Sequence, residues 1–409
     1  STHTVGGSRY RGEMALSIAH LSFSASGGAG TVASRLATAQ QAHGHHAWVH
    51  SLVSDSLWAH PWRRPLHALV AAVDHYLLRD PAFPGSVTLL RDHLSSKLPK
   101  EVRKADVVHI HWPHGLVSHD VLKDISQSTR VVWTLHDMNA FTATCHYAVG
   151  CRCYLGPENR CRGLRPMFRA SASSHWKRKM TFVHETPSIG YVSPSNWLAE
   201  EAASSAILAG RNIAVIPNLL PTPMPAVSAV TRMRERGSLG SGTVFVTSAS
   251  ELEDPVKSIS SVVTAFEEAF ASDSTARLIV VGRGTLTSQH AGIRAVGMVS
   301  QDELHRLLSM ADYFVVASLA ENQPLAVAEA QAMGVSLLAR DAAGLPEHLD
   351  IDAEGGLFQD VSSLAKLLRE KAKTSRLTTS RRQLSLAARK KFEPGEVARR
   401  YEAVYVAGS

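Results

Sequence analysis

The fold is decided by one stretch in the second half of the chain, which reads Ser318-Leu319-Ala320-Glu321-Asn322-Gln323-Pro324-Leu325-Ala326-Val327-Ala328-Glu329-Ala330-Gln331-Ala332-Met333-Gly334. It follows the apolar run 313–317, which predicts a strand. Pro324 suits the first position of a helix and Gly334 suits its end. Because the residues between them are almost all small and apolar, we expect this helix to be buried on several sides. A strand leading through a short loop into a buried helix is typical of a parallel α/β sheet.

The same alternation of apolar runs and helical patterns extends over the whole chain. Strands are predicted at residues 16–24, 47–52, 107–112, 131–135 and 189–192 in the first half, and at 243–248, 277–281, 313–317 and 335–339 in the second. Since 409 residues exceed one ordinary hydrophobic core, two domains are expected. The sequence therefore predicts an α/β protein made of two doubly wound, Rossmann-like domains.

The expected boundary between the domains lies in a proline-rich segment. Residues 218–227 contain Pro221, Pro223 and Pro225 and have no helical period, which is typical of a linker. We expect the domains and the flanking segments to span residues 1–13 (an expression remnant or disordered), 14–218, 219–392 and 393–409 (a C-terminal helix). Four prolines break residues 60–99 into short helices, which we interpret as an insertion after the second strand.

Composition and charge exclude several classes of protein. An apolar share of 44% is that of a globular chain, and the formal charge of +7 comes mostly from scattered basic residues. Solvated helix faces explain such a charge, and attraction to an anionic membrane surface is the alternative, whereas nucleic acid is not an expected partner. No apolar run reaches the roughly 18 to 20 residues of a membrane span, and no secretion signal is recognisable. We expect a cytoplasmic protein, with peripheral contact at the inner membrane face left open.

A glycine-rich loop follows the first predicted strand. It contains Gly27 and Gly28 and opens a helical pattern, so its amides favour an anion, although a simple tight turn explains it too. Gly28, Gly30 and Ala33 also fit a loose dinucleotide fingerprint. However, the second strand ends at residues 49–51 without the acidic residue that holds the ribose of NAD. An NAD-dependent oxidoreductase is therefore only a minor alternative.

Two carboxylates and a lysine suggest a site for a phosphorylated ligand. Glu329 lies in the middle of the small apolar helix and needs hydrogen-bond donors, either ribose hydroxyls or a neighbouring arginine or amide. Glu321 precedes that helix, at the sheet edge where doubly wound folds bind ligands. The amides of residues 322–325 at the helix start, and Lys257 at the start of another helix, suit a diphosphate. Gly282 and Arg283 form a second glycine turn after a strand.

In order along the chain, these segments resemble glycosyltransferase family 4, retaining enzymes of the GT-B architecture. The resemblance covers the chain from Met14 on, and Glu321 and Glu329 match the family's two acids separated by seven residues. Residues 132–138, the cysteine segment after them, residues 193–198 and residues 321–324 are most similar to colanic-acid-type, exopolysaccharide transferases. This implies two domains facing a central cleft, with the C-terminal helix packing back on the acceptor-binding first domain.

The resemblance also implies a function. It is the transfer of a hexose, with retention, from a UDP- or GDP-sugar to a glycan, lipid-linked or small-molecule acceptor, with no cofactor required. His136, Asp137 and Glu321 would be catalytic, with His136 near the anomeric centre and Glu321 on the donor sugar. The residues implied to bind the donor are Gly27, Gly28, Lys257 (diphosphate), Gly282, Arg283, Asn322, Gln323, Pro324, Leu325 and Glu329 (ribose).

One position departs from the pattern of the family. Many relatives carry an arginine about five residues before the lysine, where this chain has Leu252. Diphosphate binding is then weaker, or it uses Arg283 or another base. A degenerate protein that binds a nucleotide-sugar without catalysis is therefore the main alternative to an enzyme.

All the cysteines lie close together in the sequence, at Cys145, Cys151, Cys153 and Cys161. A cytosolic chain has little use for disulfides, so this clustering indicates thiolates gathered on one metal ion, a structural zinc. The spacing is not that of a standard zinc finger. Local disulfides and free thiols stay open as alternatives.

Overall fold

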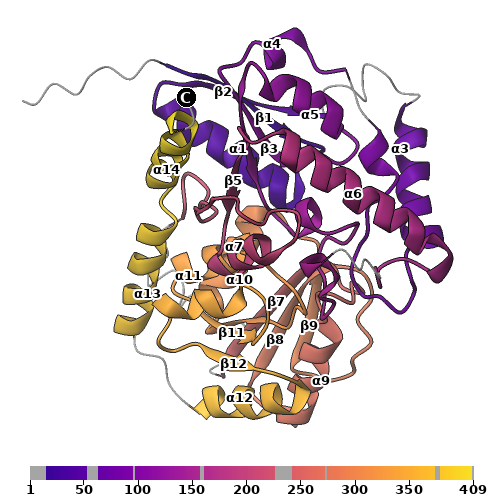
Figure 1. Cartoon of the computed structure of the whole chain (residues 1–409). Coiled ribbons are helices and arrows are strands. Elements are labelled where there is room, and N and C mark those ends of the chain that lie inside the picture. The colour runs from indigo at the N-terminus through magenta and orange to yellow at the C-terminus, as the bar shows by residue number, and fades with distance from the viewer. Residues whose placement is uncertain are drawn as a thin grey trace, which may run out of the picture.

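The computed structural model describes residues 15–52, 63–94, 97–156, 161–225, 242–271, 274–373 and 378–407. These residues form two six-stranded sheets whose strand pairings are parallel. Figure 1 shows one domain above the other, with helices around each sheet. The two doubly wound α/β domains predicted from the sequence are confirmed. The expected remnant at residues 1–13 lies outside the described part of the chain.

The first sheet has the strand order β2-β1-β3-β4-β5-β6. Its strands are β1 (Ser17–Ser22), β2 (His46–Ser51), β3 (Val107–Trp112), β4 (Arg130–Thr134), β5 (Gly190–Ser193) and β6 (Ile213–Val215), and its helices are α1 (Gly27–Ala42), α3 (Arg63–Ala72), α4 (Lys100–Arg103), α5 (His119–Ser126), α6 (Arg169–Glu185) and α7 (Asn196–Ser204). The order reverses between β1 and β3. In doubly wound sheets such a switch point opens a crevice at the carboxyl ends of the strands.

The second sheet has the strand order β12-β11-β10-β7-β8-β9. Its strands are β7 (Val244–Glu251), β8 (Arg277–Arg283), β9 (Ile293–Gly297), β10 (Tyr313–Val316), β11 (Ser336–Arg340) and β12 (Gly356–Phe358), and its helices are α9 (Ile259–Ala269), α10 (Gln301–Met310), α11 (Leu325–Ala332) and α12 (Val361–Lys373). Here the order reverses between β7 and β10. The loops after these two strands carry Lys257 and Glu321, so the switch point brings both residues to one crevice.

Two C-terminal helices connect the domains on one side of the molecule. α13 (Thr378–Lys391) lies along the second domain and α14 (Pro394–Val406) along the first, as Figure 1 shows in yellow. The buried residues Val397, Ala398, Tyr401 and Tyr405 share one face of α14 and pack in a core cluster with strand and helix residues of the first sheet. The C-terminal helix thus returns to the first domain, as expected.

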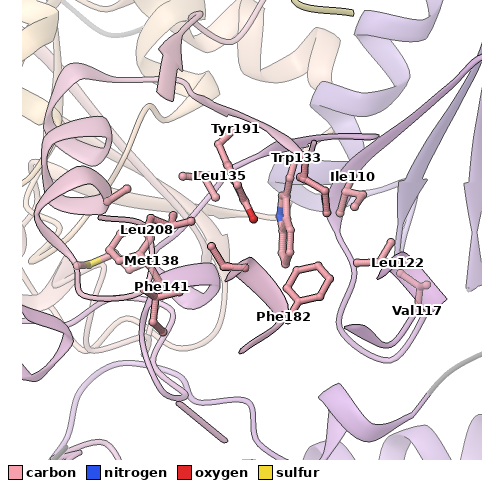
Figure 2. Packing of buried hydrophobic residues seen from close by; sticks show 14 of the residues in the cluster. Ile110, Val117, Leu122, Trp133, Leu135, Met138, Phe141, Phe182, Tyr191 and Leu208 are labelled. Carbon is pink, nitrogen blue, oxygen red and sulfur yellow. The ribbon is translucent and has the colours of Figure 1, made fainter. Parts of the chain in front are cut away.

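The core of the first domain holds the strand that leads into the predicted catalytic segment. Trp133 on β4 stacks on Tyr191 of β5, with ring centroids 6.3 Å apart, and Phe182 of α6 meets the Trp133 ring edge-on at 6.4 Å (Figure 2). Leu135 and Met138, directly beyond the strand, are buried in the same cluster. Because both neighbours of the His136-Asp137 pair are anchored in the core, the backbone of that pair has little freedom.

The sequence missed three short strands, β6, β9 and β12. β6 and β12 have only three residues each, and β9 is an edge strand with mostly exposed or half-buried side chains. None of them shows the apolar run or the alternation that a strand prediction needs. The other predicted strands agree with the structure to within about two residues except at residues 248–251, where β7 continues to Glu251.

The segment expected to hold the domain boundary lies between the two sheets, and the expected insertion follows β2. The first sheet ends at Val215 and the second begins at Val244, so the expected boundary at residue 218 lies between them. The insertion contains α3, a π-helical turn (Val73–Leu78) and a 3-10 turn (Arg91–His93). Within the described ranges, no helix is long and apolar enough to cross a membrane.

Candidate active site

A cavity of about 390 Å³ lies between the two domains, at the carboxyl ends of both sheets. The first domain contributes the start of α1 and the loop after β4, and the second contributes the loops after β7 and β10. Eight residues expected at the site line it, namely Gly28, His136, Lys257, Glu321, Asn322, Gln323, Pro324 and Leu325. Five others do not line it, namely Gly27, Asp137, Gly282, Arg283 and Glu329. We call this space the interdomain cavity.

The glycine loop gives the backbone of the first domain access to this cavity. Gly27 has a φ of +79°, a conformation that favours glycine, and Gly28 lines the cavity. A Cβ atom on Gly30 would lie 2.1 Å from the carbonyl oxygen of Ser24, so only glycine lets the helix start so close to the strand end. The start of α1 therefore faces the cavity with uncovered backbone.

Lys257 and Glu321 form an ion pair at the cavity. The Lys257 ammonium donates a hydrogen bond to Oε1 of Glu321, and the hydroxyl of Ser318 donates to the same oxygen at 3.3 Å. Burial by itself disfavours the charged lysine, but the charge and the hydrogen bond of Glu321 together with the charge of Asp254 outweigh it, so the pKa of Lys257 is raised. The lysine is therefore a fixed positive charge at the position expected for a diphosphate.

The side chain at the position where many relatives carry an arginine does not line the cavity. Leu252 is 7% exposed and packs in the core of the second domain. Arg283, the alternative base, is exposed and donates to Glu251 at 2.7 Å. Neither residue lines the cavity, which leaves Lys257 as the basic side chain in its described lining.

The loop before α11 ties the two domains together. The side-chain amide of Asn322 donates to the carbonyl oxygens of Leu135 (3.2 Å) and His136 (3.4 Å) in the first domain. The side-chain amide of Asn218 donates to the backbone oxygen of Gln323 at 2.9 Å. The side chain of Asn322 is therefore engaged between the domains, while the backbone of residues 322–325 still borders the cavity.

Glu329 makes contacts that the sequence did not predict. Its carboxylate accepts hydrogen bonds from Arg35 of α1 at 2.6 Å and from Nε2 of His305 of α10 at 2.9 Å, and the side chain is 4% exposed. Burial would raise the pKa of Glu329, but His305 and Arg35 lower it overall. The carboxylate is therefore ionised and already has donors, one of them from the other domain. An arginine was considered as a partner from the sequence, but nothing in a local pattern pointed to Arg35.

His136 is the last member of a chain of buried histidines. Its Nε2 lies 3.0 Å from Nδ1 of His111, Nε2 of His111 lies 3.0 Å from Nδ1 of His20, and Nε2 of His20 lies 2.8 Å from the amide oxygen of Gln40. Burial lowers the pKa of His136 to about 4, so the ring is neutral near pH 7.

The hydrogen-bond chain assigns a tautomer to His136. With the Gln40 amide oriented as it is, its oxygen can only accept, so His20 carries its proton on Nε2. His20 then accepts from His111, and His111 accepts from Nε2–H of His136. The proton on His136 is thus held at Nε2 and its Nδ1 keeps a lone pair. The sequence did hold a signal for His111, because His109 and His111 lie two residues apart on one face of a buried strand.

Asp137 faces away from the interdomain cavity. Its carboxylate accepts from Nδ1 of His146 at 2.6 Å, from Nε1 of Trp112 at 3.3 Å and from the backbone amide of Asn139 at 2.8 Å. Burial would raise the pKa of Asp137, but His146 outweighs burial and lowers it. His136 and Asp137 are neighbours in sequence, yet they serve two different cavities.

The cysteines form two pairs. The sulfur atoms of Cys145 and Cys161 lie 3.8 Å apart, which is about the separation of two thiolates on a tetrahedral zinc with Zn–S bonds of about 2.3 Å. Cys151 and Cys153 interact with each other, which lowers the pKa of Cys151 to about 5. Neither of them lies within 4.8 Å of the sulfurs of both Cys145 and Cys161. The described thiols are therefore not gathered on one point in this structure, and the zinc stays a prediction.

In the described part of the chain, the group whose ligand atoms lie close enough for a metal ion is the buried trio His20, His109 and His111. Its ring nitrogens already have partners. His109 contacts the hydroxyls of Tyr405 and Thr134, each at 2.7 Å, and the other two rings belong to the chain that ends at His136. We therefore interpret the trio as a hydrogen-bonded network rather than a metal site.

Family models match both domains. Residues 26–222 match the model described as Glycosyltransferase Family 4, and residues 243–372 match the model described as Glycosyl transferases group 1. No curated protein matches the chain. Because both models describe transferases, the NAD-dependent oxidoreductase alternative is abandoned.

Solved structures share the fold over the whole chain. HepE of Anabaena, solved with UDP-glucose, has a TM-score of 0.60 at 15% identity, with 96% of this chain and 100% of that chain covered. A glycosyltransferase of Rickettsia africae has 0.63 at 14% (97% and 99% covered), and sucrose-phosphate synthase of Thermosynechococcus elongatus has 0.61 at 15% (95% and 98% covered). At these identities the likeness shows the GT-B fold alone. With each of its two domains matched by a glycosyltransferase model, the chain belongs to the glycosyltransferases, with a Family 4 first domain and a group 1 second domain.

Proposed function

We propose that the protein transfers a hexosyl group from a UDP- or GDP-sugar to an acceptor hydroxyl, with retention of the anomeric configuration. The observation that carries this proposal is that the Lys257–Glu321 pair of the second domain meets His136 of the first at one cavity. A fixed positive charge, hydrogen-bonding groups and a neutral histidine suit a phosphorylated sugar. HepE of Anabaena, solved with UDP-glucose, supports a uridine nucleotide.

The proposed role of the cationic side of the cavity is electrostatic. Breaking the anomeric bond builds positive charge on the sugar and negative charge on the departing diphosphate. Lys257 and the backbone of residues 322–325 border the cavity. In the proposal, the lysine and the N–H groups of this backbone, which Pro324 lacks, face the departing diphosphate, and such preorganised groups stabilise its charge. They would supply what a divalent metal supplies in other transferases, so no metal cofactor is part of the proposal.

Two side chains are proposed to exchange partners when the donor binds. Glu321 now neutralises Lys257; a diphosphate on Lys257 would release this carboxylate toward the sugar hydroxyls. Glu329 would accept hydrogen bonds from the ribose, in competition with Arg35, its present partner. In both exchanges the carboxylate keeps a hydrogen-bond donor, so neither carboxylate is left without a partner.

The division of labour between the domains is part of the proposal. Residues 14–218 would bind the acceptor, a sugar, lipid-linked or small molecule, and residues 219–392 the donor. The protein is proposed to work in the cytoplasm. The net charge of +7 supports peripheral contact with an anionic membrane, since basic residues are attracted to such surfaces.

A second candidate function rests on Leu252. Because this side chain is buried and Arg283 is paired with Glu251, Lys257 alone faces the diphosphate. A protein that only binds a nucleotide-sugar would tolerate the loss of the arginine at position 252. An enzyme would have to stabilise the departing diphosphate with the charge of Lys257 alone.

Thermal unfolding with nucleotides tests the proposal. In the presence of EDTA we expect UDP or GDP to raise the melting temperature and NAD to leave it unchanged, because a ligand of the folded state alone stabilises it. Sugar transfer is then followed by NMR, which reads the anomeric configuration of the product. Stabilisation by NAD alone would sink the proposal, and nucleotide binding without transfer or hydrolysis of any donor would favour the non-catalytic protein.

A further inference from the structure

A second cavity, of about 470 Å³, lies in the first domain next to the interdomain cavity. Its walls come from the insertion, the end of β3 and the segment after β4. Its lining includes Arg91, Trp112, Asp137, His146 and Tyr147. We call it the Arg91 cavity. Its volume lies in the range of small-molecule sites.

The side chain of Tyr147 lies between the two cavities. Tyr147 lines both, and its hydroxyl lies 3.5 Å from the backbone oxygen of His136, to which it donates. Burial and then the nearby charge of Glu321 raise the pKa of Tyr147, so the hydroxyl is neutral and close to the donor side. A molecule in the Arg91 cavity would therefore lie directly beside the proposed position of the donor sugar.

The carboxylates around the Arg91 cavity are already engaged. Asp74 accepts hydrogen bonds from the backbone amides of Leu89, Leu90 and Arg91 at 3.0 to 3.4 Å. Asp137 accepts from Trp112 and His146, as described above. Oδ1 of Asp92 forms a hydrogen bond of 2.5 Å with Nδ1 of His114, and its Oδ2 lies 3.0 Å from Nε2 of His175.

Arg91 is left with no carboxylate of its own. Its guanidinium carbon lies 4.9 Å from the ring centroid of Phe23 and 5.6 Å from that of Trp112. Its Nε is buried without a hydrogen-bond partner. No ion pair within 4 Å joins Arg91 to an acidic residue of the described chain, although the charges of Asp74 and Asp92 act on it from nearby and partly offset the effect of burial on its pKa. Arginine stays charged in proteins and is suited to bidentate binding of phosphate and carboxylate. The two rings hold the guanidinium in place at the cavity that Arg91 lines, and its terminal nitrogens donate to no group among the described residues.

We propose that the Arg91 cavity binds the acceptor, and that the acceptor is a sugar carrying a phosphate or carboxylate group that pairs with Arg91. This inference rests on the proposed function. An acceptor hydroxyl beside Tyr147 forms the new bond to the anomeric carbon as the bond to the diphosphate oxygen breaks. The hydroxyl proton leaves with the nucleoside diphosphate, so atoms and charge balance.

The test compares Arg91→Gln with Arg103→Gln, an exposed arginine of the same domain that pairs with Asp124 at 3.2 Å. Calorimetry on the full chain, saturated with UDP to block the interdomain cavity, measures binding of glucose 6-phosphate, glucuronate and glucose. We expect at least one of the two anionic sugars to bind wild type and Arg103→Gln equally, and to bind Arg91→Gln at least tenfold more weakly. Glucose should bind more weakly than that anionic sugar. The stronger of the two anions identifies the group on the acceptor.

Two results would overturn the inference. One is that an anionic sugar binds wild type and a folded Arg91→Gln protein equally. The other is that neither anionic sugar binds. Arg91→Lys guards against a misfolded variant, because it keeps the charge and should recover part of the affinity. The UDP titration separates the two proposals. If UDP binds and only the Arg91 effect is absent, the acceptor site is wrong; if UDP does not bind, the donor proposal fails first.

Discussion

The carboxylate of Glu329, on the second domain, accepts a hydrogen bond of 2.6 Å from Arg35, on the first, although 294 residues separate them in the chain. Arg35 also donates to the backbone oxygen of Leu219 at 3.1 Å. One arginine thus joins the start of the linker, the first helix and the residue proposed to bind the ribose. If Glu329 binds the ribose as proposed, occupation of the donor site and the contact between the domains are coupled through this residue.

Substituting each partner of the contact between Glu329 and Arg35 tests the ribose role of Glu329. If Glu329 binds the ribose, Glu329→Ala should weaken UDP binding by about 1.5 to 3 kcal/mol, the range for charged hydrogen bonds, or tenfold and more. Arg35→Ala removes the competitor and should leave UDP affinity unchanged or higher. Both variants should melt at lower temperature, since breaking a buried ion pair leaves a charge uncompensated. Calorimetry with UDP, beside melting curves, separates the effects. Equal UDP affinities of wild type and a folded Glu329→Ala protein would rule out the ribose role.

Substitutions of Lys257 and Glu321 should affect different quantities, UDP affinity for the lysine and turnover for the glutamate. Lys257→Gln should weaken UDP binding tenfold or more, because the diphosphate loses its charged partner. Glu321→Ala should leave UDP affinity nearly unchanged while lowering turnover, since its proposed contact with the sugar matters as the anomeric bond breaks. Calorimetry and a transfer assay measure the two quantities. The exposed Lys366→Gln serves as a control for loss of one positive charge. A Glu321→Ala protein with normal turnover would contradict its catalytic role.

The buried histidines predict how stability depends on pH. Burial lowers the pKa of His20 to about 4, and holds the pKa values of His109 and His111 well below their ordinary value. In the unfolded chain these rings bind protons below about pH 6.5, whereas the folded protein keeps them neutral. Stability should therefore fall as the pH drops from about 6.5 toward 4, by up to about 1.4 kcal/mol per pH unit for each ring.

Urea unfolding between pH 7.5 and 5 measures this dependence. His111→Gln, which can still hydrogen bond but cannot take up a proton, should reduce the slope. The exposed His184→Gln should not change it. A stability that stays constant over this interval would show that the three rings are not held neutral.

The cysteine pairs predict a bound metal. We expect protein purified without added metal to carry about one zinc per chain, because Cys145 and Cys161 already have the separation of two zinc ligands. Cys151 and Cys153 would have to move toward this pair to complete the site. Elemental analysis measures the metal, and a chelator should lower the melting temperature. Protein without zinc whose thiols do not react after denaturation would instead contain two disulfides.

The sequence by itself determined the elements with a strong local signal. Apolar runs marked the central strands of both sheets, and Pro324 and Gly334 marked the buried helix within a residue or two of its bounds. Gly27, Gly28, Lys257 and Glu321 follow strands of parallel sheets, so topology alone places them at a sheet edge. These predictions depend on periodicity and on backbone chemistry, which a chain carries locally.

Only the tertiary structure decided which distant groups meet. It paired Glu329 with Arg35 and directed Asp137 into the Arg91 cavity although His136 faces the other one. It also left Arg91 without an ion pair among the described residues. It also formed the edge strands β6, β9 and β12, whose short segments carry no pattern of their own. The physical reason is that a hydrogen bond or ion pair depends on where two side chains point after the domains have packed, and neither periodicity nor spacing in the sequence encodes that direction.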